Sequence, residues 1–116
     1  MKRKQWVPLG SIVWLKGSMV KFLVVARGMN VSGDKGEYFF DYGAVPYPRG
    51  LTKDELVYFN HEQISSIYYI GCNDAENEHV ENLLNDYIRD HMELKRISPE
   101  EWAAMTNKTE DETKNE

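Results

Sequence analysis

The sequence predicts one α+β domain: a small five-stranded antiparallel β-sheet or SH3-like barrel over about residues 10–71, followed by one long and one short C-terminal helix. Two observations predict it. The front half holds short runs of apolar, β-branched and aromatic residues separated by glycine, proline and asparagine turns. In the back half, apolar residues recur every three or four positions on a polar background, which is the helical period. A length of 116 residues fits one domain.

The expected strands are short and follow the apolar runs. They are residues 11–15, 20–26, 37–42, 56–59 and 64–70. The stretch 28–36 carries three glycines and predicts a flexible loop, and 46–50 predicts a rigid extended segment that ends in a turn. Between the last two strands, Asn60 predicts the cap of a single helical turn, which Gln63 would close.

Two helices are expected after the sheet. Asn73 or Asp74 would cap the first, over 74–95, and its apolar positions form one stripe. Ser98 and Pro99 then predict the start of a second helix over 99–106.

The domain boundaries follow from these elements. We expect an N-terminal segment over 1–8 and a single domain over 9–106, with its β part over 9–72. Residues 107–116 hold no apolar side chain and predict a disordered acidic tail.

Charge and composition restrict the class of function. Residues 1–72 hold nine Lys/Arg and six Asp/Glu, whereas residues 73–116 hold five and thirteen. The basic residues are scattered rather than clustered, so nucleic-acid binding is not expected. No apolar run approaches the roughly 20 residues that span a bilayer, and no secretory signal is recognisable. We therefore expect a cytoplasmic protein with no membrane association.

The sequence predicts no catalytic residues, no metal site and no cofactor, and hence no enzyme. His79 and His91 are twelve positions apart on one expected helix, too far apart to share a metal ion. The lone Cys72 lies close to Asp74, which would raise rather than lower the pKa of its thiol. Common hydrolase, metalloprotease and nucleotide-binding motifs do not occur.

Candidate partner-binding residues lie in the aromatic and proline-rich stretch 39–50. Tyr42, Tyr47 and Arg49 combine the side chains typical of interface anchors, although a core strand followed by a turn also fits this stretch. Trp102 is a further candidate, either packed against the sheet or docked on a partner. We predict a protein partner, and an exposed sheet edge could also pair two copies into a homodimer.

Three segments resemble a known family. Residues 9–17 (LGSIVWLKG), 40–50 (FDYGAVPYPRG) and 58–64 (YFNHEQI) are similar to the opening, middle and third motifs of the family called domain of unknown function 4176. The resemblance covers residues 8–71. The chain departs from the middle motif at Gly43-Ala44, and its Phe39-Phe40 pair is unusually aromatic.

The resemblance implies a function but no catalytic residue. Members are characteristic of low-GC Gram-positive bacteria, often in gene clusters of the type VII secretion system that export LXG-domain toxins. It implies a non-enzymatic cytoplasmic accessory protein, a chaperone or targeting adaptor for such a toxin. Two alternatives stay open: an immunity protein that neutralises a cognate toxin, and an RNA-binding small β-barrel.

Overall fold

A computed structural model describes residues 6–33, 36–52, 56–91, 93–97, 101–102 and 104. It confirms the α+β class and the five antiparallel strands. The elements are β1 (Ile12–Leu15), β2 (Lys21–Gly33), β3 (Gly36–Tyr47), β4 (Val57–Phe59), the 3-10 turn η1 (His61–Gln63), β5 (Ile64–Tyr69) and helix α1 (Ala75–Asp90).

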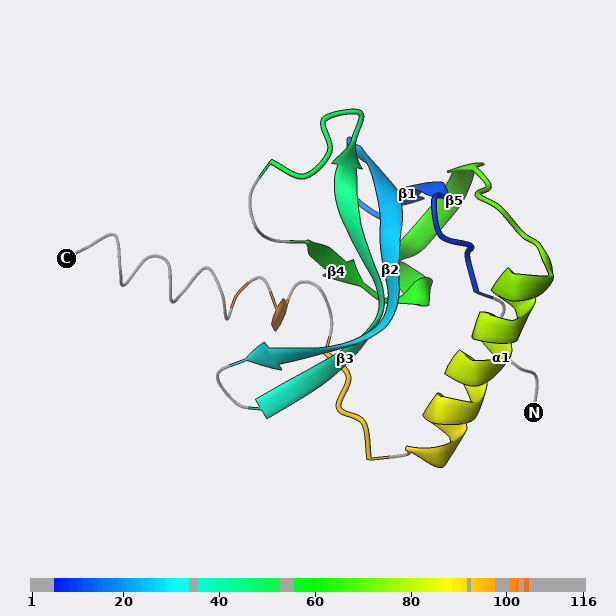
Figure 1. The fold of residues 1–116 in the computed structure, drawn as a ribbon. Helices are drawn as coiled ribbons and strands as arrows, with labels where there is room; N and C mark the ends of the chain where they lie inside the picture. The colour runs from blue at the N-terminus through cyan, green and yellow to red at the C-terminus, as the bar shows by residue number, and fades with distance from the viewer. Residues whose placement is uncertain are drawn as a thin grey trace.

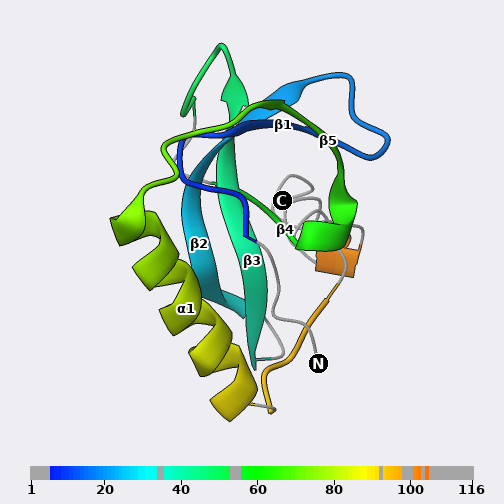
Figure 2. The same cartoon turned by 90° about the vertical axis from the view of Figure 1, so that its right-hand side faces the viewer.

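The strands form one antiparallel sheet in the order β4-β3-β2-β1-β5. β1 to β4 therefore follow one another as a meander, and β5 returns to pair with β1 after the single turn η1. β2 and β3 are the two long strands of the sheet and are curved, and α1 runs alongside them (Figures 1 and 2). The sheet has two outer strands, β4 and β5.

The expected loop over 28–36 is wrong, because most of it is strand. β2 continues to Gly33, and its pairing with β3 runs through Asn30↔Phe39 to Gly33↔Gly36. The glycines do not break the strand: Gly28 adopts φ 64° within β2, beside Leu84 of α1. Pairing with the aromatic start of β3 therefore overrides the local preference of a glycine-rich stretch for a loop.

Helix α1 begins as expected and ends early. The Asp74 carboxylate caps it by accepting a hydrogen bond from the Asn77 backbone N–H at 2.9 Å. The helix ends at Asp90 rather than Lys95, because the chain turns back there toward the sheet. The Phe39 N–H then donates to the Lys95 carbonyl at 2.8 Å, which fixes the returning segment beside β3.

Among the described residues, α1 is the one helix with defined bounds after the sheet. Of the short helix expected over 99–106, Glu101, Trp102 and Ala104 are described and no second helix is defined; the expected tail over 107–116 lies outside the described residues.

The core lies between the sheet, α1 and the N-terminal segment. Its central buried side chains are Trp6, Val7, Val13, Val24, Tyr42, Ala44 and Phe59. Trp6 is 3% exposed and donates from Nε1 to the Asn85 Oδ1 of α1 at 3.0 Å. Residues 6–8, which we assigned to a separate N-terminal segment, thus supply part of the core.

Candidate functional site

A buried polar cluster surrounds Asp41 of β3, a residue of the middle motif, and includes Asn60 of the third motif. The Asp41 side chain is fully buried, and its carboxylate accepts from the His61 backbone N–H at 2.9 Å and from Arg96 at 2.8 Å. The Asn60 Oδ1 accepts from the Asp41 backbone N–H at 3.1 Å. These bonds join β3, η1 and the segment after α1, so the cluster holds the fold together.

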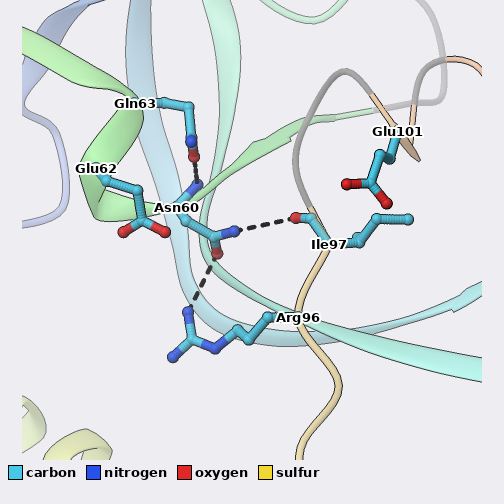
Figure 3. Close-up of a pocket in the computed structure, with 6 residues that line it drawn as sticks. All are labelled: Asn60, Glu62, Gln63, Arg96, Ile97 and Glu101. Carbon is cyan, nitrogen blue, oxygen red and sulfur yellow. Dashed lines mark hydrogen bonds between the residues drawn. The ribbon is translucent and has the colours of Figure 1, made fainter.

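Asn60 connects this cluster to Gln63, Arg96 and Ile97 (Figure 3). Its backbone N–H donates to the Gln63 Oε1 at 2.8 Å, which closes η1 as the sequence predicts. The capping box expected between Asn60 and Gln63 is present. The Asn60 amide also donates to the Ile97 carbonyl at 3.2 Å, and its oxygen accepts from Arg96 at 3.3 Å. A residue expected to act locally therefore ties the C-terminal segment to the sheet.

An open pocket of about 200 Å³ adjoins the cluster. Its lining residues are Asn60, Glu62, Gln63, Arg96, Ile97 and Glu101 (Figure 3). The amide and guanidinium groups in its wall are engaged in the structural bonds described above. Its described lining also includes the carboxylates of Glu62 and Glu101 and contains no Ser, Thr, Cys, His or Lys side chain.

The Tyr42 side chain belongs to the core and not to the surface. It is fully buried, stacks on Phe59 with ring centroids 5.4 Å apart and meets Trp6 edge-on. Its hydroxyl oxygen accepts from the Val7 N–H at 2.8 Å and lies 3.2 Å from His61 Nδ1. Burial raises the pKa of the Tyr42 phenol well above its ordinary value. A partner cannot reach this ring in the folded protein.

Cys72 has the environment of an unreactive thiol. Its side chain is exposed, and its pKa is raised above the ordinary value, chiefly by the negative charge of Asp74. Because the thiolate is the nucleophilic form, this environment opposes reactivity at neutral pH. Throughout the described ranges, no three His, Cys, Asp or Glu side chains gather as metal ligands would.

Three aromatic side chains on the sheet surround a lysine. The Lys21 Nζ lies 5.4 Å from the ring centroid of Trp14, 5.5 Å from that of Tyr47 and 4.1 Å from that of Tyr68. Strand register explains this group, because Lys21 pairs directly with both Trp14 and Tyr47. Tyr68 lies two residues beyond Ser66, the partner of Trp14 on β5. We call these four residues the Lys21 cluster.

The Lys21 cluster adjoins the outer edge of the sheet. β5 is an outer strand, and its side chains are exposed on both faces: Ile67 is 44%, Tyr68 61% and Tyr69 59% exposed. Across the described part of the chain, no strand pairs with its outer side. Exposed aromatic side chains beside an unpaired edge are typical of a surface that binds another chain.

The four residues proposed from sequence do not form one site. Tyr47 is 39% exposed and belongs to the Lys21 cluster, and Arg49 is exposed two residues further along the chain. Trp102 packs instead within the protein, with ring centroids 5.5 Å from Phe40, 6.0 Å from Tyr38 and 6.3 Å from Tyr58. With Tyr42 in the core, Tyr47 and Arg49 stay available for contact with a partner.

Sequence reasoning missed the other members of the cluster. Trp14, Lys21 and Tyr68 come from β1, β2 and β5, and none is remarkable within its own strand. Their association depends on strand register, which a single sequence does not specify when the connections vary in length. The available indication was the absence of Asp and Glu from residues 6–33, 42–52 and 63–73.

A second surface feature lies between α1 and β2. Val80 and Leu83 are 40% and 55% exposed and border an open apolar groove of about 420 Å³. Tyr87 lines the same groove and stacks on Phe39 with ring centroids 6.1 Å apart. The groove contains no titratable group apart from this tyrosine, so it offers packing rather than chemistry.

Comparison with known proteins places this architecture in a family. No curated protein and no solved structure matches the chain. Within the described ranges, no helix has the length and apolar character that a membrane crossing requires. A family model described as "Domain of unknown function (DUF4176)" matches residues 6–80, from the buried Trp6 to the second turn of α1. Because this match covers more than half of the chain, the protein belongs to the DUF4176 family.

Proposed function

We propose that this protein is a non-enzymatic accessory factor of the cytoplasm, a chaperone or targeting adaptor that binds a type VII-secreted toxin of the LXG type. The observation that carries the proposal is the Lys21 cluster beside the unpaired edge of β5. The family resemblance implies an LXG toxin as the partner, and the exposed surface supports a binding role.

The chemistry of the surface favours a protein partner. Tyrosine and tryptophan supply large contact areas at a low entropic cost, and they commonly carry most of the affinity of an interface. Tyr47 and Tyr68 are exposed and held in place by the lysine between them. The polar residues of the motifs, by contrast, form structural hydrogen bonds around Asp41. Exposed aromatic residues available for contact, together with motif polar residues used in structural hydrogen bonds, support a binding protein rather than an enzyme.

The strand order supports a description of the sheet as an SH3-like barrel. β1 to β4 form a meander, η1 follows, and β5 returns to β1. Small barrels of this kind use exposed aromatic side chains and edges to bind peptides. The analogy is at the level of the fold and leaves the ligand to the site itself.

An immunity protein is the second candidate, and α1 is the observation that favours it. Residues 74–93 hold seven acidic side chains and one arginine, most of them exposed. Such a surface could cover the basic active site of a toxin. An RNA-binding barrel would instead stack bases on the rings of the Lys21 cluster.

Co-expression of the tagged chain with the genes that neighbour its own tests the proposal. We expect a tagged chain to retain the toxin in stoichiometric amounts. The double substitution Tyr47→Ala plus Tyr68→Ala should weaken the complex by about a hundredfold, because two interface anchors are lost. Leu83→Ala is the matched control: it removes an apolar side chain of similar exposure from α1 and should leave affinity unchanged.

The same complex separates the candidate functions. A chaperone supports the stability or export of the toxin, whereas an immunity protein abolishes its activity in the purified complex. Nucleic acid that elutes with the chain and dissociates steeply with salt would favour the RNA-binding function. A tagged chain that elutes without the toxin would overturn the proposal.

A further inference from the structure

Lys21 is a positioned cation that has no acidic partner within the described ranges. Three rings from β1, β3 and β5 surround its ammonium group, at 4.1 to 5.5 Å from their centroids. None of the ion pairs formed by the described residues includes it. Aromatic rings stabilise the charge without occupying its hydrogen-bond donors. The ammonium group is therefore held in place and can still donate to an anion.

The surroundings of Lys21 make this part of the sheet selective for negative charge. Residues 6–33, 42–52 and 63–73, which form β1, β2, β5 and the end of β3, contain no Asp or Glu. They do contain Lys16, Lys21 and Arg49. After β5, the acidic residues begin at Asp74 and continue on α1 and further along the chain, whereas the exposed Glu62 of η1 directly precedes β5. An acidic segment would thus be attracted to the Lys21 cluster and repelled by α1.

β5 supplies a backbone template next to this cation. Its sequence, ISSIYY, has no charge and no proline, the features with which proteins usually protect an outer strand. Tyr68 belongs both to β5 and to the Lys21 cluster. A chain paired with β5 would run beside Tyr68, whose ring contacts the Lys21 ammonium group across the intervening strand β1. The six residues of β5 suit an extended partner segment of about the same length, roughly 20 Å.

We propose that the bound partner presents an extended acidic segment, which pairs with the outer edge of β5 and places an Asp or Glu carboxylate on Lys21. This inference rests on the proposed function in that it names the chemistry recognised by the same surface. The main-chain hydrogen bonds provide affinity, and the Lys21 cluster selects the segment.

A second copy of the chain fits this site less well than a distinct partner. Pairing two copies edge to edge would bring β5 against β5, and ISSIYY carries no carboxylate. Lys21 of each copy would then face no carboxylate from the β5 strand of the other copy. Charge complementarity therefore favours a heterologous acidic strand over a homodimer.

Selection from random peptides tests the inference without knowledge of the toxin. A phage library of random twelve-residue peptides is panned against the purified full-length chain. We expect enrichment of peptides that combine Asp or Glu with β-branched and aromatic residues. Lys21→Gln should weaken the best synthetic peptide by about tenfold or more, because a charge-assisted hydrogen bond is lost. Lys95→Gln, which removes an exposed lysine from the segment after α1 and outside the Lys21 cluster, is the matched control and should change affinity by less than twofold.

A scan of backbone N-methylation tests strand pairing directly. In an added strand, alternate N–H groups point to β5 and the others point to solvent. N-methylation should therefore abolish binding at every second position of the peptide and be tolerated between. Uniform tolerance, enrichment of basic or helical peptides, or full affinity of the Lys21→Gln chain would overturn the inference. So would a dimer in light scattering that the peptide cannot dissociate.

The outcomes separate this inference from the proposed function. If selected peptides bind as a strand and depend on Lys21, but no toxin is retained in co-expression, the proposed function is overturned and the acidic-strand site is supported. If a stoichiometric toxin complex forms and tolerates Lys21→Gln, the proposed function is supported and the acidic-strand site is overturned.

Discussion

The guanidinium of Arg96 lies 2.8 Å from the carboxylate of Asp41 and joins the segment after α1 to the middle of β3. Asp41 is fully buried, whereas the Arg96 side chain is 35% exposed and extends over the Phe39 ring. A buried carboxylate requires such a partner, because removing one member of the pair leaves an uncompensated charge. The family's motif residue Asp41 thus depends on a residue outside the matched range 6–80.

Arg96→Met should lower the free energy of unfolding by about 2–4 kcal/mol. Methionine keeps an apolar side chain over Phe39 and removes the charge that compensates Asp41. Denaturant unfolding measures the loss. Arg89→Met provides the control, since Arg89 pairs with Asp86 and Asp90 on the exposed face of α1 and should cost under about 0.5 kcal/mol. In the double variant with Asp41→Asn, the two losses should be less than additive; strict additivity would show that the residues are not coupled.

Trp6→Ala should lower the free energy of unfolding by about 3–5 kcal/mol, which is the cost of removing a buried aromatic side chain. Trp6 is 3% exposed and contacts both Tyr42 and Asn85. Met19→Ala is the control, because Met19 is 94% exposed and its removal should change stability by less than about 0.5 kcal/mol. A Trp6→Ala chain as stable as the parent would place residues 6–8 outside the folding unit.

Tyr42 gives the protein a predicted sensitivity to alkali. Its pKa in the folded state is raised above the ordinary value of about 10, first by burial. The unfolded chain therefore releases the phenol proton near pH 10, while the folded chain retains it. This contribution to stability is complete below pH 10 and declines above it, by about 1.4 kcal/mol per pH unit. Tyr42→Phe removes that decline.

The measurement is the urea unfolding free energy of both chains between pH 8 and about 11. At pH 8 the Phe variant should be less stable, because the hydrogen bond from the Val7 N–H is lost. The difference between the two chains should shrink above pH 10. A constant difference across the series would contradict the raised pKa.

Several parts of the fold could be predicted from local sequence. Short β-branched and aromatic runs identified all five strands, and the Asp74 side chain caps α1 as its position indicated. These features depend on residues close together in the chain. The start of an element was therefore more predictable than its length: α1 ended earlier than expected, and β2 ran to Gly33.

The remaining features depend on distant residues. The sequence around Tyr42, rich in glycine and proline, is typical of an interface residue. In the structure, however, Trp6 and Phe59 from other segments of the chain pack on its ring and bury it. The Lys21 cluster forms only if four strands pair in the observed register. The β2–β3 register shifts between Val24 and Ala26, and no sequence pattern predicts this shift. Tyr47 and Arg49 stay predictions for the partner surface, drawn from an aromatic and an arginine side chain beside proline, and both are exposed in the structure.

Gly28 and Gly50 provide a final comparison of local strain with steric conflict. Both adopt positive φ, 64° and 82°, where a side chain costs about 1–2 kcal/mol. A Cβ at Gly50 would have nothing within 4 Å, whereas one at Gly28 would collide with Leu84 Cδ2 of α1. Gly28→Ala should therefore lower the unfolding free energy by at least about 1 kcal/mol more than Gly50→Ala, because Leu84 must move out of its packed position. Equal losses in denaturant unfolding would mean that α1 adjusts freely against β2.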